Sequence, residues 1–204
     1  KEILNKLGNK TEAKKVAKEA GVQTILSINI EEKEFKNLQI SAKKIGFPLM
    51  IKASWGGGGR GMRIVRNEKE LINQVNEAKS EAKKAFGKDE IFLEKYLEDA
   101  AHVEVQILGD QFGNTVHLFD RDCSIQRRHQ KIIERAPADF IDNKLREKIC
   151  DAAISIAQKV NYVGAGTVEF LLDKKSNDFY FIEVNPRIQV EHTVTEEVTG
   201  IDIV

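Results

Sequence analysis

Apolar positions recur along the chain with two periods, and these predict both helices and strands. Spacing of three to four residues is typical of amphipathic helices, whereas alternation in steps of two is typical of half-buried strands. Helical spacing covers the segments 11–19, 32–45, 67–86 and 142–160. Extended patterns cover 22–30, 47–52, 62–66, 91–97, 103–108, 115–119, 166–173 and 179–193, and the end of the chain at 201–204 is strand-like. The mixture predicts an α+β fold.

Local signals mark the ends of the predicted helices. Thr11 is a capping residue at the start of the first helix, and Gly46 closes the second. Asn67 caps the third helix, with Glu70 in the capping-box position. The fourth helix carries apolar residues at helical spacing and no candidate chemistry, so we expect it to support the core.

The segments 166–173 and 179–193 predict a hairpin, because the polar run between them is a turn signal. A turn centred on Ser176 places Glu169 directly opposite Glu183. Alternation divides the second segment into an apolar face and a polar face. The apolar face is Tyr180, Ile182 and Val184, and the polar face is Glu183, Asn185, Arg187, Gln189, Glu191 and Thr193.

Two carboxylates at opposite positions of a hairpin predict a cation site. Cross-strand neighbours lie about 5 Å apart, and two bare carboxylates there repel by about 3 kcal/mol at an effective dielectric near 20. A divalent cation between Glu169 and Glu183 removes that repulsion, and hard oxygen ligands with Asn185 nearby suit Mg²⁺. Two solvated glutamates on an open sheet face remain the alternative.

The segment 53–62 is rich in glycine and lies between two predicted strands. It fails the P-loop pattern, which needs Lys and Ser/Thr after the last glycine. It matches G-x-G-x-x-G literally but precedes a strand rather than the required helix. A glycine-rich tip with Lys52 at its base indicates a flap over a nucleotide phosphate. A hairpin loop without a ligand is the alternative for this segment.

Lys10 lies just before the first predicted helix, where it is well placed to contact an anion at the helix N-terminus. An exposed lysine without a ligand is the alternative.

A charged run covers 120–131 and leaves three interpretations open. It is compatible with a solvated loop, with an anion site containing Gln126, His129 and Lys131, or with a short nucleic-acid patch. The run lacks interleaved aromatic residues for base stacking. His117, on an apolar strand, is expected to be structural.

Composition narrows the class of protein. The chain has 204 residues, 41% hydrophobic and 31% charged, with a formal net charge of zero. Nothing global therefore points to nucleic acid or to an anionic membrane, and no run approaches the ~18 apolar residues of a membrane span. Two isolated cysteines and no visible signal peptide indicate a reducing compartment, the cytoplasm or, in a eukaryote, the mitochondrial matrix. Both ends read as cut from a longer chain.

Five motifs together resemble the biotin carboxylase component of biotin-dependent carboxylases, which has the ATP-grasp fold. They are I-K-A-S-W-G-G-G-G-R-G-M-R at 51–63, E-K-Y-L at 94–97, R-D-C-S-I-Q-R-R-H-Q-K at 121–131, G-A-G-T-V-E-F at 164–170 and F-I-E-V-N-P-R-I-Q-V-E-H-T-V-T-E at 181–196. The resemblance covers nearly the whole chain in family order. Within the family, the residues at 192–197 and Trp55 are most similar to pyruvate carboxylases.

The resemblance implies three regions. Residues 1–23 are a helical segment that joins a preceding domain, 24–96 are the ATP-grasp flap subdomain, and 97–204 are most of the catalytic half. It also implies a site. ATP contacts are Lys10, Lys52, Gly57, Gly58, Gly59, Glu94, Lys95, Leu97, His102, Gln126, His129 and Leu171; metal ligands are Glu169, Glu183 and Asn185; bicarbonate contacts are Lys131, Arg187, Gln189 and Val190. The implied catalytic residues are Glu191, as the base that deprotonates bicarbonate, with Lys131 and Arg187.

By the same resemblance, the reaction is ATP- and bicarbonate-dependent carboxylation of biotin through carboxyphosphate. The implied cofactors are ATP, Mg²⁺ or Mn²⁺, and biotin on a separate carrier domain. The implied partners are that carrier, the rest of the biotin carboxylase domain, a carboxyltransferase domain and further copies in a homo-oligomer, with no nucleic acid and no membrane. Asn9 departs from the aspartate usual in the family, and a later arginine lies beyond Val204 in family members. Another bicarbonate-activating ATP-grasp ligase, such as carbamoyl phosphate synthetase, or an inactive nucleotide-binding module remains an alternative.

Overall fold

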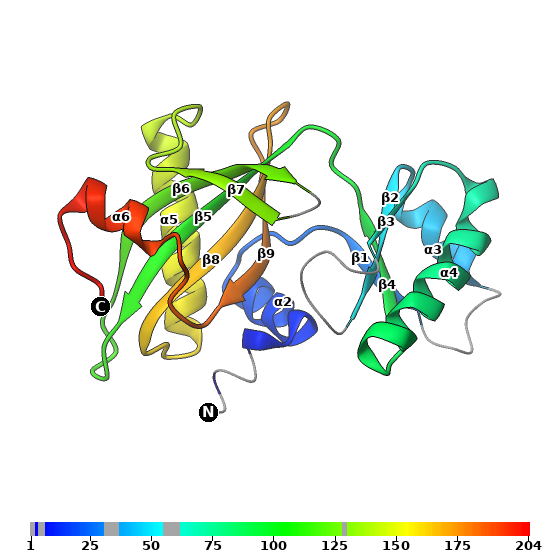
Figure 1. Cartoon of the computed structure of the whole chain (residues 1–204), viewed down its shortest axis with the longest axis horizontal. Helices are drawn as coiled ribbons and strands as arrows, with labels where there is room; N and C mark the ends of the chain where they lie inside the picture. Colours follow the sequence, from blue (N-terminus) through cyan, green and yellow to red (C-terminus); the bar gives the residue numbers. More distant parts are fainter. Residues whose placement is uncertain (1–2, 4–6, 31–36, 55–61, 128–129) are drawn as a thin grey trace. The chain divides into compact units, whose positions relative to one another are not determined.

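Two sheets, one of four strands and one of five, organise the chain (Figure 1). The structure is a computed structural model that describes residues 3, 7–30, 37–54, 62–127 and 130–204. The chain divides into two compact units. The larger unit contains Lys1–Thr24, Asp99–Arg127 and Lys131–Val204, and the smaller unit contains Ile25–Glu98 and Arg128–Gln130.

The smaller unit is a four-stranded sheet packed against two helices. Its strands lie in the order β1-β4-β2-β3, with bounds β1 Ser27–Ile30, β2 Leu49–Ala53, β3 Arg63–Val65 and β4 Ile91–Lys95. Helices α3 (Leu38–Ile45) and α4 (Glu68–Phe86) bury their apolar stripes in one core with these strands. The Asn67 side chain accepts hydrogen bonds from the backbone of Lys69 and Glu70, so the predicted cap of α4 is confirmed.

The larger unit is a five-stranded sheet in the order β7-β6-β5-β8-β9. The strands are β5 Ala100–Gly109, β6 Thr115–Arg127, β7 Gln130–Arg135, β8 Gly164–Asp173 and β9 Phe179–Asn185. The helices are α2 Lys10–Glu19, α5 Asn143–Lys159 and α6 His192–Thr199. Helices α2 and α5 share a hydrophobic core with β5, β8 and β9 (Figure 1). This arrangement confirms the predicted α+β class and the supporting role of α5.

Two predicted helix or strand boundaries differ from the structure, and a third is not tested. Asn9, not Thr11, caps α2: its side-chain oxygen accepts from the backbone N–H groups of Thr11 and Glu12. The side-chain oxygen of Asn9 therefore caps this helix as the oxygen of an aspartate would. The start of the predicted helix 32–45 is not tested, because 31–36 lie outside the described residues, and α3 covers Leu38–Ile45 with Gly46 at its end, as predicted. The last segment, 201–204, is not a strand.

The charged run is part of the sheet rather than a loop. Strand β6 continues to Arg127, and Asp120, Arg121 and Asp122 on it are all buried. The interpretation as a solvated loop was therefore wrong for 120–127. Burial there is possible because each of the three charges has a charged partner, as buried charges require.

The hairpin of β8 and β9 contains one irregularity. Glu169 pairs with Glu183, as predicted, but Phe170 pairs with Phe181, so Ile182 has no partner in the register. This bulge shifts the alternation, as an extra residue in one strand does. Phe181 is fully buried in place of Tyr180 and Ile182, which are half-buried. The predicted inward face was right for Val184 and wrong for the other two residues.

Beyond Asn185 the chain leaves the extended conformation. Residues 190–191 form a turn, and α6 begins at His192. The prediction that Arg187, Gln189 and Glu191 share one strand face was therefore wrong, since Pro186 ends the sheet pairing. Among the residues that the structure describes, no helix combines the length and the apolar character that a membrane crossing needs.

Candidate active site

A row of four charged residues crosses the sheet of the larger unit. Arg121 on β6 is paired with Glu104 on β5, Glu104 with Glu169 on β8, and Glu169 with Glu183 on β9. Direct cross-strand partners point to the same face and lie about 5 Å apart. Three adjacent carboxylates on one sheet face repel one another, so cations must compensate them.

Lys131 on β7 supplies one of those cations. Its Nζ contacts Glu104 Oε2, lies 2.9 Å from Glu169 Oε1 and lies 2.7 Å from Glu191 Oε1. Burial lowers the pKa of Lys131, but the charges of Glu169 and Glu104 outweigh it, so the pKa is raised above the ordinary 10.5. The ammonium group is therefore held charged at the centre of three carboxylates.

Glu169 is the most densely contacted carboxylate of the row. Its Oε1 accepts a hydrogen bond of 2.8 Å from the Asn185 amide, and its Oε2 lies 2.9 Å from His102 Nε2. That Nε2 atom makes no hydrogen bond of good geometry within the described residues, so the contact between His102 and Glu169 is a close charge contact and not an aligned hydrogen bond. Burial raises the pKa of Glu169, but His102 and Lys131 lower it by more, and the net pKa lies below the ordinary 4.5.

His102 is fixed from its other side by Gln126. The Gln126 Nε2 group lies 2.7 Å from His102 Nδ1 and donates to the backbone oxygen of Cys123. An amide nitrogen has no lone pair to offer, so His102 Nδ1 is the acceptor. The imidazole proton then sits on Nε2, which faces Glu169. The sequence placed these two residues in one site, and the structure brings them together.

Glu191 and Gln189 reach the same cluster from the turn before α6. Burial raises the pKa of Glu191, but the hydrogen bond from Lys131 outweighs it, so the pKa is lowered and the carboxylate is ionised. Gln189 is buried, with its Nε2 at 3.5 Å from Glu169 Oε1. Its Oε1 is also buried and has no hydrogen-bond partner among the described residues. A buried orphan acceptor calls for a donor, such as a ligand hydroxyl.

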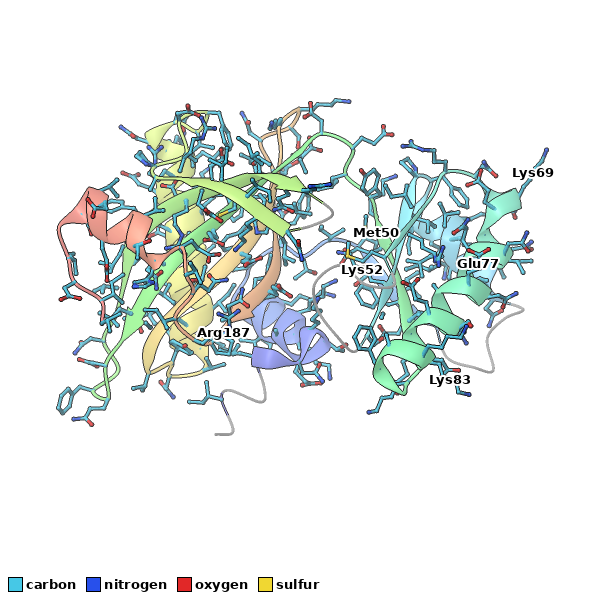
Figure 2. The ribbon with its side chains drawn as sticks, in the orientation of Figure 1. Met50, Lys52, Lys69, Glu77, Lys83 and Arg187 are labelled. Atoms are coloured by element: carbon cyan, nitrogen blue, oxygen red, sulfur yellow. The ribbon has the colours of Figure 1, made fainter. Side chains whose placement is uncertain are left out.

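One predicted bicarbonate contact, Arg187, does not lie in the cluster. Arg187 is exposed, and its Nη1 donates to the backbone oxygen of Ile188 at 3.0 Å. Figure 2 labels Arg187 in the segment that follows β9. Val190 is 88% exposed, and the predicted contact of its backbone with bicarbonate stays a prediction.

Two of the predicted metal ligands, Glu169 and Glu183, are direct cross-strand partners, and the third, Asn185, donates to Glu169. Glu183 pairs with Lys10 at 3.2 Å, and Lys10 is the first residue of α2. Ligand atoms of His102, Glu104 and Glu169 lie within 4.8 Å of one another, the one such group of three in the described part of the chain. The side chains of Glu169, Glu183 and Asn185 can each offer an oxygen ligand, and this donor set fits Mg²⁺. In the structure, both carboxylates form ion pairs with lysines instead: Glu183 with Lys10 and Glu169 with Lys131.

The smaller unit carries a second group of candidate residues. Lys52 on β2 contacts Glu94 on β4, and both side chains are largely buried. Lys52 and Met50 lie two residues apart on β2 (Figure 2) and so share a face of that sheet. Lys95 donates to the backbone oxygen of Phe47 at 3.3 Å, and Leu97 is half-buried.

Some predicted residues cannot be placed in either cluster. Gly57, Gly58, Gly59 and His129 lie outside the described residues. Leu171 is half-buried on β8 opposite Tyr180. His117 is structural as expected, since its Nδ1 accepts from the Phe119 backbone at 3.2 Å.

Glu104 and Arg121 were missed from the sequence. A signal for Glu104 exists, because His102, Glu104 and Gln106 alternate with valines along β5. Arg121 gave no comparable signal, because acidic residues flank it on both sides and hide the strand alternation.

Comparisons with known proteins identify the family of this chain. Residues 9–204 match the family described as carbamoyl-phosphate synthase L chain, ATP binding domain. The chain is 53% identical to pyruvate carboxylase of Bacillus subtilis over 203 residues, which are 100% of this chain and 18% of that protein. It is 51% identical to the mitochondrial methylcrotonoyl-CoA carboxylase subunit alpha of Rattus norvegicus over 98% of this chain and 28% of the relative.

A solved structure supports the same assignment. The biotin carboxylase domain dimer of Hydrogenobacter thermophilus 2-oxoglutarate carboxylase, in complex with MgADP, ADP and bicarbonate, superposes with a TM-score of 0.91. It is 48% identical, covering 98% of this chain and 44% of that chain. The chain therefore spans less than a third of these two curated relatives and under half of the solved domain. With the matched motifs and the charged row on its sheet, the chain belongs to the ATP-binding domain family of the carbamoyl-phosphate synthase L chain and, within it, to the ATP-grasp biotin carboxylase domains.

Proposed function

We propose that this chain activates bicarbonate with ATP for the carboxylation of biotin, the first half-reaction of a biotin-dependent carboxylase. The observation that carries the proposal is the contact of Lys131 Nζ with Glu104, Glu169 and Glu191 beside the orphan acceptor Gln189 Oε1. A cation, an ionised carboxylate and an unsatisfied acceptor together suit a small anion that also carries a hydroxyl group.

The proposed metal is Mg²⁺, or Mn²⁺, held by Glu169, Glu183 and Asn185. When bound, it supplies positive charge that neutralises the phosphate oxygens of the nucleotide. Lys10 pairs with Glu183 and Lys131 pairs with Glu169. We expect both lysines to exchange these carboxylates for substrate oxygens when the site is loaded.

Glu191 is the proposed base. It accepts the proton of the bicarbonate hydroxyl, after which a bicarbonate oxygen attacks the γ-phosphorus of ATP and ADP leaves. Lys131, Gln189 and the Val190 backbone hold the anion, and Arg187 joins them after its exposed side chain turns from the Ile188 oxygen. The carboxyphosphate product breaks down to CO₂ and phosphate, and the phosphate takes the proton of biotin N1 before that nitrogen captures CO₂.

The proposed nucleotide contacts are those that the family resemblance implies. They are Lys10, Lys52, Gly57, Gly58, Gly59, Glu94, Lys95, Leu97, His102, Gln126, His129 and Leu171. Their support is the match of the motifs that contain them to the family, together with the Lys52–Glu94 pair at the base of the glycine-rich segment.

The most specific part of the proposal is the identity of the acyl acceptor, the substrate that the whole enzyme carboxylates. Identity of 53% to a pyruvate carboxylase and 51% to a methylcrotonoyl-CoA carboxylase subunit does not separate the two classes. The residues at 192–197 and Trp55 favour pyruvate. The proposed partners are a biotinylated carrier domain, the remaining part of the biotin carboxylase domain, a carboxyltransferase domain and a second copy, since the relative of known structure is a dimer.

The test is ADP release from Mg·ATP by the intact enzyme with and without bicarbonate and free biotin. We expect release to depend on bicarbonate. Lys52→Ala should weaken Mg·ATP binding in a calorimetric titration, with thermal unfolding measured in parallel because Glu94 loses a buried partner. ADP release that is unchanged by bicarbonate would contradict the proposed reaction, and equal affinities would contradict the role of Lys52.

A further inference from the structure

Arg121 is a fully buried residue on β6, and its guanidinium group pairs with Glu104, a member of the candidate active site. Its Nε donates to Glu104 Oε1 at 2.6 Å. Its Nη1 donates to Gln106 Oε1 and to Thr195 Oγ1, both at 2.8 Å, and its Nη2 donates to Thr167 Oγ1 at 3.3 Å. All four acceptors belong to buried residues on three different elements besides β6: β5, β8 and α6.

One arm of this network leads to Lys131. The two oxygens of Glu104 are divided between two cations: Oε1 accepts from Arg121, and Oε2 contacts Lys131 Nζ. The carboxylate cannot rotate toward Lys131 without breaking the Arg121 bond. Arg121 therefore fixes the position of the acceptor that holds the ammonium group.

The other arm leads to Glu191. Helix α6, whose residues are all described, has Thr195 as its buried residue, and Val198 on the same helix is 53% exposed. The helix therefore has little apolar anchorage, and the Arg121–Thr195 hydrogen bond is its buried polar contact with the sheet. Glu191 is the residue directly before α6, four positions and about one helical turn from Thr195.

We propose, on the basis of the function proposed above, that Arg121 is a positioning residue that sets the placement of Lys131 Nζ against the Glu191 carboxylate through Glu104 and Thr195. It acts through these residues and does not touch bicarbonate. The planar guanidinium fork can hold Glu104 and Thr195 at the same time, whereas a lysine ammonium at this position is a single point donor on a flexible stem.

An alternative to positioning is that Arg121 only stabilises the fold. Buried ion pairs contribute little net stability compared with apolar residues of similar volume, so stability alone is a weak reason for a buried arginine. The apolar face of the same sheet already provides a core with α2 and α5. The two explanations predict different results for a conservative substitution: positioning predicts a lower kcat in Arg121→Lys, whereas a role in stability alone predicts an unchanged kcat.

The experiment compares four single variants of the intact enzyme and the double variant Arg121→Lys/Thr195→Val. Arg121→Lys keeps the charge, so Glu104 retains a cation and the fold is protected. Thr195→Val removes the hydroxyl at nearly constant shape, and Thr195→Ser keeps it. Arg146→Lys is the matched control, because Arg146 is also largely buried and pairs with Asp120 at 2.8 Å, away from the Lys131 cluster.

We expect Arg121→Lys and Thr195→Val to lower kcat of bicarbonate-dependent ATP cleavage by about 10 to 100-fold, the scale for a catalytic group displaced by about 1 Å. Affinity for Mg·ATP should stay within about twofold, Thr195→Ser should recover most of kcat, and Arg146→Lys should leave kcat unchanged. The loss of kcat in the Arg121→Lys/Thr195→Val double variant should be smaller than the product of the two single losses, because both residues act through one hydrogen bond. An unchanged kcat in Arg121→Lys, or an equal loss in Arg146→Lys, would overturn the inference.

A second readout separates this inference from the proposed reaction. Hydrogen–deuterium exchange of the amides in 190–199 should accelerate in Arg121→Lys and Thr195→Val and not in Thr195→Ser or Arg146→Lys. If wild type releases no ADP in response to bicarbonate while exchange follows this pattern, the proposed function fails and the positioning contact stands. If exchange in this segment is the same in all variants, the positioning role of Arg121 fails whatever the enzyme does.

Discussion

On the central strands β5 and β8 of the larger unit, the two faces of the sheet are equally buried and chemically opposite. On β5, Val103 and Val105 point to the core shared with α2 and α5, whereas Glu104 and Gln106 point to the other face. All four residues have no exposed surface. The same alternation occurs on β8, where Val168 lies between Thr167 and Glu169.

The difference shows that burial by itself does not define a stabilising core. The apolar face gains free energy from every non-polar contact, roughly in proportion to area. The polar face must match each charge with a partner, and its net contribution to stability is small. The apolar face therefore specifies the fold, and the polar face positions chemical groups that would be costly anywhere else. Four variants test this division, from the largest expected effect to the smallest.

Glu191→Gln tests the polar face most strongly. We expect bicarbonate-dependent ATP cleavage to fall by about 10² to 10⁴-fold, the usual range for the loss of a positioned general base. The amide keeps the shape but cannot accept the proton, and Mg·ATP affinity should change little. Steady-state kinetics over a bicarbonate series, with the exposed Glu197→Gln as control, measure the effect.

A different outcome would assign Glu191 to binding only. If Glu191→Gln raises KM for bicarbonate and leaves kcat intact, the residue merely braces Lys131 through their 2.7 Å ion pair. Such a result would remove the base from the proposed mechanism and keep the anion site.

Phe170→Ala tests the apolar face. Phe170 is fully buried, with edge-to-face contacts to Phe179 and Phe181 at ring-centroid distances of 5.6 and 6.4 Å. We expect the free energy of unfolding to fall by about 3–5 kcal/mol in urea titrations, because the substitution leaves a cavity. Phe112→Ala, at a residue 80% exposed, should change it by less than about 0.5 kcal/mol. Equal effects of the two substitutions would contradict the assignment of the core.

Glu169→Gln tests how the polar face depends on pH. Burial raises the pKa of Glu169, but His102 and Lys131 lower it by more, so the folded-state pKa lies below 4.5. A lowered folded-state pKa contributes stability that is fully present above the unfolded-state pKa and is lost as pH falls through the folded-state value. Glutamine does not titrate, so the free energy of unfolding should fall less steeply in the variant below about pH 4.5.

The measurement is urea unfolding of wild type and Glu169→Gln from about pH 6 to about pH 3, a range that brackets the ordinary carboxyl pKa. Glu147→Gln, at an exposed position on α5, is the control and should run parallel to wild type. Parallel curves for all three proteins would mean that Glu169 gains no net stabilisation from His102 and Lys131.

Gln189→Met should have the smallest effect on stability. The Oε1 atom of Gln189 is buried and has no hydrogen-bond partner in the part of the chain that the structure describes, so an apolar side chain of similar size should leave the free energy of unfolding unchanged or slightly higher. KM for bicarbonate should rise by about 2 to 12-fold, equivalent to one hydrogen bond of about 0.5–1.5 kcal/mol. A clear loss of stability with unchanged KM would show that Gln189 belongs to the fold rather than to the anion site.

Helices α2, α3, α4 and α5 and most strands followed from local pattern, because side-chain periodicity and capping chemistry act within a few residues. Asn67 at α4 and the hairpin register of Glu169 with Glu183 are examples. The bulge at Ile182 and the helix after Glu191 were not predicted. A one-residue insertion changes every later face, and the choice between strand and helix at 192–199 depends on what the segment packs against.

The sequence by itself determined which residues could carry the chemistry: a lysine beside a glycine-rich segment, and acids and amides at fixed spacing near the C-terminus. Only the tertiary structure decided which of them meet. Glu104 contacts Arg121 and Lys131, which are 17 and 27 residues away, and Lys131 contacts Glu191, which is 60 residues away. Periodicity sets the face on which a side chain lies, whereas strand order and register set its neighbours. Those are fixed by the burial of the opposite, apolar face of the same strands.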